Sequence, residues 1–166
     1  MVSLREASEK DIDALHEIYS HETVSPNMGF DPCSRDEFEE IYREFSTAGQ
    51  ILVGEDHHGV MAVCLVNRRK FRLRHSAYVG SLAVHFSAQG SGVGREFFGS
   101  IIDQLIDEGF SRIELLVATD NKIAIEFFQK LGFEVEGTHI DYFSRAGSDS
   151  LFSEHTMALL TSRNPG

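Results

Sequence analysis

Cysteine is scarce in this sequence, which has two such residues, Cys33 and Cys64, in a chain of 166. Two cysteines are too few for a disulfide framework, and they lack the CxxC spacing of a redox or metal motif. Cys64 lies in an apolar run, where a buried, inert thiol is the ordinary expectation. We therefore expect a protein of a reducing compartment and predict a cytoplasmic location.

Basic residues are also few, because 15 Lys and Arg stand against 26 Asp and Glu and give a formal net charge of -11. Binding to a nucleic-acid backbone needs clustered Lys and Arg, so we expect no nucleic-acid partner. Long apolar runs are missing as well, since no stretch approaches the ~20 residues of a membrane span. The first residues, "MVSLREASEKD", lack a basic segment followed by an apolar one. We expect no membrane partner.

Proline occurs three times, outside the strongly periodic runs, and no internal repeat or low-complexity linker divides the chain. A length of 166 residues is within the usual range of one compact domain. We predict a single domain over residues 1–166, with its core at about residues 2–161.

The hydrophobic pattern alternates between strands and amphipathic helices. Capping-box pairs, Ser8 with Asp11 and Ser34 with Glu37, precede the first two helical runs, and Asn121 is a plausible cap of the last. The strands are predicted at residues 2–6, 51–56, 60–69, 76–86, 112–119, 133–140 and 151–160. The apolar helix faces are predicted to comprise Ile12, Leu15, Ile18 and Tyr19; Phe38, Ile41, Tyr42 and Phe45; Val93, Phe97, Ile101, Leu105 and Ile106; and Ile123, Ala124, Phe127, Phe128 and Leu131. This order predicts an α/β sandwich with a mixed sheet.

A glycine-rich stretch, "QGSGVG" at residues 89–94, joins a predicted strand to a predicted helix. Glycine permits positive φ and close approach of a ligand, and the free N–H groups at a helix start bind anions. The stretch is neither a Walker loop nor GxGxxG, because Arg95 stands where the third glycine would be. A cation in the first helical turn opposes the helix dipole unless an anion is bound. The stretch predicts a pyrophosphate site, the alternative being a tight turn with a solvated Arg95.

Two motifs in order resemble the GNAT N-acetyltransferases. "SLAVHFSAQGSGVGREFF" resembles their motif A, whose signature is carried by Gln89, Gly92 and Gly94. "NKIAIEFFQKLGFEVEG" resembles their motif B, with matching residues Asn121, Ala124, Lys130, Gly132, Phe133 and Gly137. The closing "EGTHIDYFSRAG" resembles members that acetylate amino acids, small amines or protein N-termini. Because the element order is also similar, the resemblance covers nearly the whole chain. It implies a GNAT-type acyl-CoA N-acyltransferase fold, with a mixed, mostly antiparallel central sheet flanked by helices.

The resemblance implies acetyl-CoA as co-substrate. It assigns the pyrophosphate to Gln89, Gly90, Ser91, Gly92, Val93, Gly94 and Arg95. The backbone of Leu82, Ala83 and Val84 would pair with the pantetheine arm, and Asn121, Ala124 and Phe128 would also contact the cofactor. Asn121 is equally explained as a helix cap, and it can serve both roles.

In the family, the amine attacks the thioester directly, and the resemblance makes the Val84 N–H the donor to the oxyanion. Many members place a carboxylate on the preceding strand as the base, but residues 76–86 contain none. Tyr78 stands where some members have Glu, yet a phenol with a pKa of ~10 is a poor base at neutral pH. If side chains alternate along the strand, Ser81 and His85 lie on the face opposite to Tyr78. The identity of the base stays open.

Many members have Tyr at the position of Phe128 to protonate the departing thiolate, and Phe cannot do so. Tyr142 matches a Tyr of the resembling members and is expected either to pack and contact the acceptor or to act as the acid. Glu22 and Asp31 lie in the loop from which the family builds part of its acceptor site. Each either binds a cationic amine or is merely solvated.

The adjacent His57 and His58 fall in a predicted hairpin turn and point apart, so we predict no metal site. The predicted function is transfer of the acetyl group from acetyl-CoA to a primary amine of a small molecule or amino acid. The alternatives are a protein N-terminal or lysine acetyltransferase and a non-catalytic acyl-CoA-binding sensor. The predicted partners are an amine-bearing small molecule or peptide, with the protein a monomer or homodimer.

Overall fold

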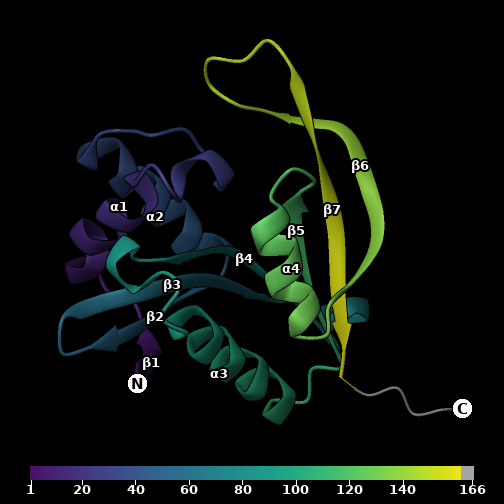
Figure 1. The fold of residues 1–166 in the computed structure, drawn as a ribbon. Coiled ribbons are helices and arrows are strands. Elements are labelled where there is room, and N and C mark those ends of the chain that lie inside the picture. Colours follow the sequence, from purple (N-terminus) through teal and green to yellow (C-terminus); the bar gives the residue numbers. More distant parts are fainter. Residues whose placement is uncertain (162–166) are drawn as a thin grey trace, which may run out of the picture. The chain divides into compact units, whose positions relative to one another are not determined.

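The computed structural model describes residues 1–161 (Figure 1). Its strands are β1 (Ser3–Glu6), β2 (Gln50–Asp56), β3 (Gly59–Arg68), β4 (Ser76–Val84), β5 (Arg112–Ala118), β6 (Glu134–Ser144) and β7 (Leu151–Leu160). Its α-helices are α1 (Ile12–Ser20), α2 (Arg35–Ala48), α3 (Val93–Asp107) and α4 (Lys122–Lys130). Short 3₁₀ turns are η1 (Glu9–Asp11), η2 (Ser25–Asn27), η3 (Phe71–Leu73) and η4 (Phe86–Ala88). The predicted order of strands and helices is confirmed.

The strands form one seven-stranded sheet in the order β1-β2-β3-β4-β5-β7-β6. The β4–β5 pair is parallel, whereas β1–β2, β2–β3, β5–β7 and β6–β7 are antiparallel. The predicted mixed, mostly antiparallel sheet is therefore confirmed. The chain divides into a first compact unit, residues 1–67 and 79–104, and a second unit, residues 68–78 and from 105 onward. That residues 1–166 form a single domain stays a prediction, and residues 162–166 lie outside the described residues.

In the first unit, helices cover both faces of the strands (Figure 1). On one face, α1 and α2 pack on a cluster of buried side chains that comprises Ile12, Leu15, Ile18, Tyr19, Val24, Phe38, Tyr42, Ile51, Val53, Val60, Val63, Leu65 and Ala83. On the other face, α3 lies so close that a Cβ at Gly54 would meet Phe97 Cδ2 at 2.7 Å. Gly54 thus permits the close packing of α3 on β2, because any larger side chain would clash with a fully buried ring.

Both predicted capping boxes are present at the starts of the first helical segments. The Ser8 N–H donates to Asp11 at 2.7 Å, and the Ser34 N–H donates to Glu37 at 2.8 Å. Asp11 is 7% exposed and also accepts two 2.9 Å hydrogen bonds from Arg5. These bonds lower the pKa of Asp11 to about 2. Because Arg5 also donates to Glu55 at 2.7 Å, it ties β1 to η1 and β2.

Strand β4 contains a backbone irregularity at Ser81, whose φ is 50°. The Tyr19 hydroxyl of α1 donates a 2.7 Å hydrogen bond to the Ser81 carbonyl. Burial raises the pKa of Tyr19 well above its ordinary value, so the phenol stays a donor. A left-handed residue interrupts the side-chain alternation of a strand. The alternation assumed between Tyr78 and His85 is therefore interrupted at Ser81.

In the second unit, β7 lies between β5 and β6, and β6 and β7 form a long hairpin (Figure 1). Strand β6 continues to Ser144, four residues beyond the predicted end. Its register against β7 shifts between His139 and Phe143, where Asp141 has a φ of 50° and its N–H donates to Ser153 Oγ at 3.0 Å. The strand was predicted too short because this bulge breaks the period-two pattern.

Two residues of the predicted apolar helix faces are exposed. Ile106 is 43% exposed and Ile123 is 85% exposed, so both predictions are wrong. Successive helical residues are about 100° apart, and hence the buried Leu105 turns Ile106 outward. In α4, the buried face contains Ile125 and Phe128, which leaves Ile123, about 200° from Ile125, pointing away. None of the helices within residues 1–161 has the length and apolar character of a membrane span.

Candidate active site

The glycine loop follows β4 and leads into α3 within the first unit. After Val84 the chain makes the turn η4, in which the Ala88 N–H donates to the His85 carbonyl at 2.8 Å. Gly90 and Gly92 have φ of 73° and 93°, and a Cβ at either would meet nothing within 4 Å. Space alone would admit side chains here, so the left-handed backbone is what requires glycine.

The loop is fastened to the end of β4 by side-chain contacts. Gln89 Nε2 donates to the Val84 carbonyl at 3.1 Å and to Thr23 Oγ1 at 2.9 Å. A Cβ at Gly94 would lie 3.0 Å from a Val84 methyl group, so the first turn of α3 abuts the strand end. These contacts bring together three residues that were predicted to bind the cofactor, namely Val84, Gln89 and Gly94.

The start of α3 presents backbone N–H groups that its own helix cannot satisfy. Its first intrahelical bond runs from the Glu96 N–H to the Gly92 carbonyl at 3.0 Å, which leaves the preceding N–H groups of the first turn directed outward. Ser91 Oγ faces the Val93 N–H at a long 3.4 Å. Gly90, Ser91, Gly92 and Arg95 are exposed. This exposed helix start can bind an anion.

A group of side chains beside the end of β4 was not identified from the sequence. His85 Nδ1 lies 2.8 Å from Ser87 Oγ, and its Nε2 lies 3.7 Å from Glu17 of α1. The Phe86 ring lies against both His85 and His21, with centroid distances of 4.3 and 4.5 Å. The contacts join residues 17, 21 and 85, and no periodic signal in the sequence relates such distant positions. They link the end of α1 to the segment that leads into the glycine loop.

The other predicted residues of β4 lie in different surroundings. Ala83 is 5% exposed and is part of the core beneath α1 and α2, and Leu82 is half-buried. Tyr78, in the second unit, lies 5.9 Å from the Arg69 guanidinium and pairs in register with Glu114 of β5. Glu114 is bound by Arg69 at 2.7 Å and by Arg112 at 3.0 Å. A carboxylate so engaged is poorly suited to accept a substrate proton.

Asn121, Ala124 and Phe128 belong to the second unit. Asn121 Oδ1 accepts the Ala124 N–H at 3.2 Å, so the predicted helix cap is confirmed. The Asn121 N–H donates to the Ala118 carbonyl at 3.0 Å, which places the cap directly at the end of β5. Phe128 is 7% exposed and packs against Phe133, with 5.8 Å between the ring centroids.

Tyr142 lies on β6, is 59% exposed, and has its ring 4.7 Å from that of His139. At the hairpin tip, Arg145 donates to Asp120 at 2.5 and 3.0 Å and lowers the pKa of that carboxyl. The Arg145 guanidinium also lies over the rings of Phe143 and Phe152, at 5.2 and 4.2 Å. Arg145 thereby anchors the hairpin to the turn that precedes Asn121, a contact that the sequence did not reveal.

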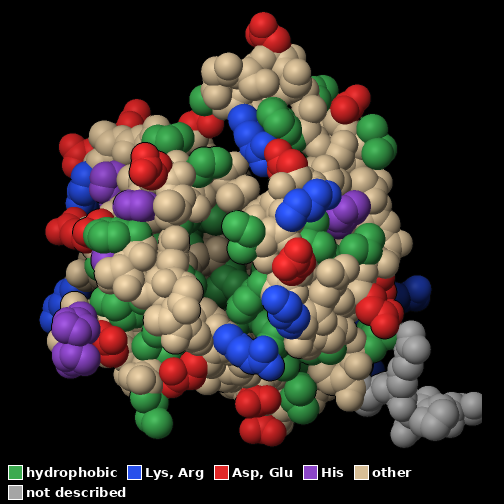
Figure 2. Space-filling model, viewed as in Figure 1, with side chains coloured by type: hydrophobic (Ala, Val, Ile, Leu, Met, Phe, Trp, Pro, Cys, Tyr) green, Lys and Arg blue, Asp and Glu red, His purple; other side chains and the backbone are tan. Residues whose placement is uncertain are grey.

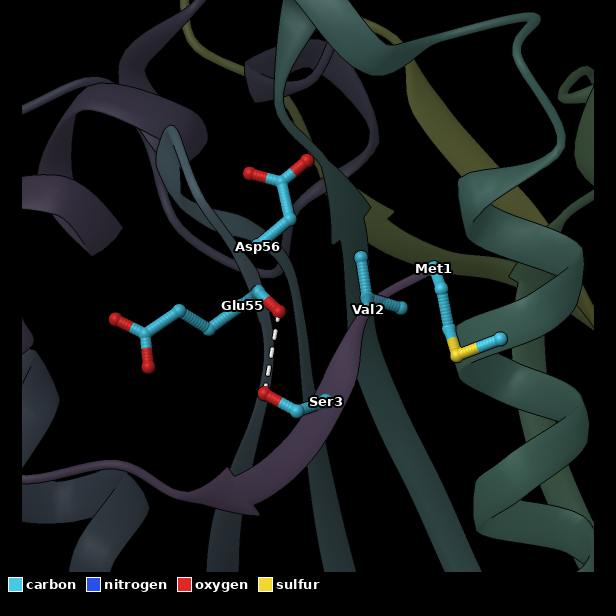
Figure 3. A pocket seen from close by; sticks show the side chains of 5 residues that line it. All are labelled: Met1, Val2, Ser3, Glu55 and Asp56. Carbon is cyan, nitrogen blue, oxygen red and sulfur yellow. Dashed lines mark hydrogen bonds between the residues drawn. The ribbon is translucent and has the colours of Figure 1, made fainter.

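The predicted acceptor residues Glu22 and Asp31 are both exposed and lie in the segment between α1 and α2. Acidic side chains are dispersed over the face shown in Figure 2, with Lys and Arg among them. A surface hollow is lined by Met1, Val2, Ser3, Glu55 and Asp56, with the Ser3 hydroxyl donating to the Glu55 carbonyl at 3.2 Å (Figure 3). None of these five was predicted as a site residue. Within residues 1–161, no group of three or more His, Cys, Asp or Glu is arranged to hold a metal.

The sequence was compared with known protein families. Residues 12–133 match the model of the acetyltransferase (GNAT) family. The chain belongs to this family. The match begins at α1 and ends at Phe133, so it includes the glycine loop and the cap of α4.

Similarity to curated proteins is partial for this GNAT chain. It is 36% identical to an uncharacterised protein of Mycobacterium leprae over an alignment of 72 residues. This alignment covers 43% of the chain and 19% of that protein. It is 31% identical to a 2-phospho-L-lactate guanylyltransferase of Archaeoglobus fulgidus over an alignment of 99 residues. This alignment covers 58% of the chain and 47% of that protein. The chain therefore spans less than half the length of these curated relatives.

Similarity to solved structures covers nearly the whole GNAT chain. A GCN5-related N-acetyltransferase from Kribbella flavida is 26% identical, with a TM-score of 0.76 over 96% of this chain and 97% of that one. Spermidine N-acetyltransferase from Vibrio cholerae, solved with CoA and spermine, is 22% identical, with a TM-score of 0.82 over 99% of this chain and 98% of that one. The predicted GNAT-type fold is confirmed.

Proposed function

We propose that this protein is an acetyl-CoA-dependent N-acetyltransferase that acetylates a primary amine of a small molecule or amino acid. The observation that carries the proposal is the exposed loop of residues 89–95, in which two left-handed glycines lead into the free N–H groups of α3. Family membership supplies the chemistry that such a loop serves, and the V. cholerae relative was solved with CoA.

The residues of the loop fit a pyrophosphate. No Cβ obstructs the backbone at Gly90 or Gly92, the N–H groups of Gly94 and Arg95 are in the first turn of α3, and Arg95 is exposed beside them. A net charge of -11 does not oppose such binding, because distant carboxylates are screened beyond ~8 Å whereas the loop acts at contact distance. The cofactor roles of Leu82, Ala83, Asn121, Ala124 and Phe128, like those of Val84 and residues 89–95, stay predictions.

Acetyl-CoA supplies a thioester whose carbonyl the acceptor amine attacks. The protein must favour a neutral amine and donate a hydrogen bond to the developing oxyanion, the role proposed for the Val84 N–H. Strand β4 carries no carboxylate, so we propose that the amine loses its proton to water or to a loop residue. A thiol of pKa ~8.5 is a fair leaving group, and so we infer that the thiolate departs without a dedicated acid.

The test is release of free thiol from acetyl-CoA with a panel of amino acids, small amines, aminoglycosides and N-terminal peptides. Turnover with any small amine that requires an intact glycine loop supports the proposal. Turnover confined to peptides would instead indicate an N-terminal or lysine acetyltransferase. Tight acetyl-CoA binding without thiol release above background hydrolysis across the panel would establish the sensor function and reject ours.

Substitutions at Phe128 and Tyr142 test whether the protein supplies a general acid to the departing thiolate. Because Tyr142 is largely exposed, we expect it to contact the acceptor through its ring, so that Tyr142→Phe keeps kcat within about threefold. Phe128→Tyr is expected to change kcat as little. A fall in kcat of up to the ~10²-fold typical of a general acid, measured for Tyr142→Phe at saturating acceptor, would show that Tyr142 delivers the proton instead.

A further inference from the structure

The connection between β3 and β4, which belongs to the second unit, concentrates the basic residues of an acidic chain. The stretch "RRKFRLRH", residues 68–75, contains five of the 15 Lys and Arg, and no Asp or Glu stands between Asp56 and Glu96. Apart from this stretch, the chain has 26 acidic residues against ten basic ones. A local cluster of one charge sign on a chain of the other sign favours contact with an oppositely charged partner.

The two inner arginines of this stretch are engaged within the protein. Arg68 Nη2 donates to Glu108 at 2.8 Å, and Arg69 Nη2 lies 2.7 Å from Glu114. Three outer cations are exposed and take part in no ion pair within residues 1–161, namely Lys70, Arg72 and Arg74. The positive charge of the turn is therefore open to a partner outside the chain.

Phe71 stands in the middle of this turn, in a conformation that favours glycine. Its φ is 56°, which is rare for a bulky residue, and it is 86% exposed. The Leu73 N–H donates to the Lys70 carbonyl at 3.1 Å and the Arg74 N–H to the Phe71 carbonyl at 3.2 Å, so backbone bonds close the turn. Strained residues cluster where a protein binds a ligand. The fold does not account for a phenyl ring at this position.

Apolar and basic side chains alternate along residues 70–74, which we call the basic tip. Leu73 is 50% exposed, so it presents a second apolar side chain beside that of Phe71. Exposed apolar groups among unpaired cations suit an anionic bilayer, because the apolar groups enter the acyl boundary while the cations stay among the headgroup phosphates. The expectation of no membrane partner rested on the lack of a span and of a leader, and peripheral contact needs neither.

Other anionic partners fit the basic tip less well. Single-stranded nucleic acid is bound by several aromatic rings on which successive bases stack, whereas the tip has one ring and an aliphatic Leu73. A protein partner in a specific interface covers ~800 Å² on each side, far more than a turn of five residues. Such a partner would also meet the mainly acidic remainder of the chain. A bilayer can be contacted by the tip alone.

We propose that the basic tip docks on the surface of a bilayer that contains anionic phospholipids. Lys70, Arg72 and Arg74 lie among the headgroup phosphates, while Phe71 and Leu73 enter the boundary with the acyl chains. Attachment through so few groups is reversible, and it weakens as the salt concentration rises. The inference is independent of the proposed acetyltransferase function, because neither acetyl-CoA nor the acceptor takes part in it.

The first measurement follows position 71 directly. The chain has no tryptophan, so Phe71→Trp introduces a single fluorophore. Its emission should shift to the blue with vesicles of phosphatidylcholine and phosphatidylglycerol in equal parts, because the ring leaves water, and should not shift with phosphatidylcholine alone. Ile123→Trp is the matched control, since Ile123 of α4 is 85% exposed and lies outside the basic tip. Its emission should stay the same with both kinds of vesicle.

Sedimentation with the same vesicles measures the strength of binding. We expect the wild-type protein to bind the mixed vesicles at least about tenfold more strongly than phosphatidylcholine alone. Lys70→Gln should weaken this binding about fivefold, the contribution of one cation near an anionic surface. Lys130→Gln, which changes another exposed lysine without an ion pair within residues 1–161, should leave it unchanged.

A further variant separates binding from folding. Phe71→Gly should weaken binding to the mixed vesicles at least about tenfold, through loss of the buried ring. It should keep or raise the Tm, because glycine adopts a φ of 56° without steric cost. Should this variant fail to fold, Leu73→Ala replaces it, because Leu73 is half exposed and the same loss of binding is expected.

The results that overturn the proposal are distinct. Equal binding to both kinds of vesicle, or an unshifted emission of Phe71→Trp, rejects it. Equal losses in Lys70→Gln and Lys130→Gln would show that binding follows net charge and not the basic tip, which also rejects it. Unchanged binding in the folded Phe71→Gly or Leu73→Ala protein has the same meaning. Binding of a labelled oligonucleotide but not of vesicles, lost in Phe71→Gly, would identify a nucleic-acid surface instead.

Discussion

Replacement of Gly92 by Val is expected to weaken acetyl-CoA binding at least about 100-fold, as measured by calorimetry. Gly92 has a φ of 93°, which costs a side-chain-bearing residue roughly 1–2 kcal/mol and which a β-branched residue adopts least readily. The loop would then leave this conformation and misdirect the N–H groups of α3. Hydrogen bonds to a charged group contribute about 1.5–3 kcal/mol each, so the loss of two gives the expected factor.

Gly99 offers a matched control for this substitution. It lies within α3, a Cβ there would meet nothing within 4 Å, and its φ is not positive. Gly99→Val should therefore retain both the circular dichroism spectrum and the affinity for acetyl-CoA. A folded Gly92→Val protein with unchanged cofactor affinity would show that the loop is a turn and not a pyrophosphate site.

The second large effect is expected in the pH dependence of acetylation. Because β4 carries no carboxylate and Glu114 is engaged by two arginines, kcat/KM should follow the fraction of neutral acceptor. It should rise about tenfold per pH unit below the pKa of the acceptor amine. Rates measured with two amines of different basicity should give profiles displaced by the difference between the two pKa values.

A dedicated general base on the protein would give a different pH profile of kcat/KM. A group of the protein that titrates near neutral pH, at about 6 to 7 as for a histidine, would produce a plateau at the same pH for every acceptor. Such a plateau would direct attention to His85, which is held beside the strand end by Ser87 and Glu17. Its loss in His85→Gln would then identify the base and contradict our proposal.

The sequence by itself determined the order of the strands and helices, the capping residues Ser34 and Asn121, and the position of the glycine loop. These features depend on neighbours within a few residues: a cap bonds an N–H three positions on, and a helix face repeats every 3.6 residues. Ile106 and Ile123 were nevertheless misplaced, because the rotation of about 100° per residue turns them away from the buried Leu105 and Ile125.

The tertiary structure alone decided the contacts between distant positions. The left-handed Ser81 accepts a hydrogen bond at its carbonyl from Tyr19, which lies 62 residues earlier in the sequence. The bulge at Asp141 depends on the pairing of β6 with β7, and Arg145 reaches back to Asp120. No local sequence pattern predicts these contacts, because the residues that form them are far apart in the sequence and meet only in the folded chain. The glycine loop could therefore be predicted from sequence, whereas these contacts between distant positions could not.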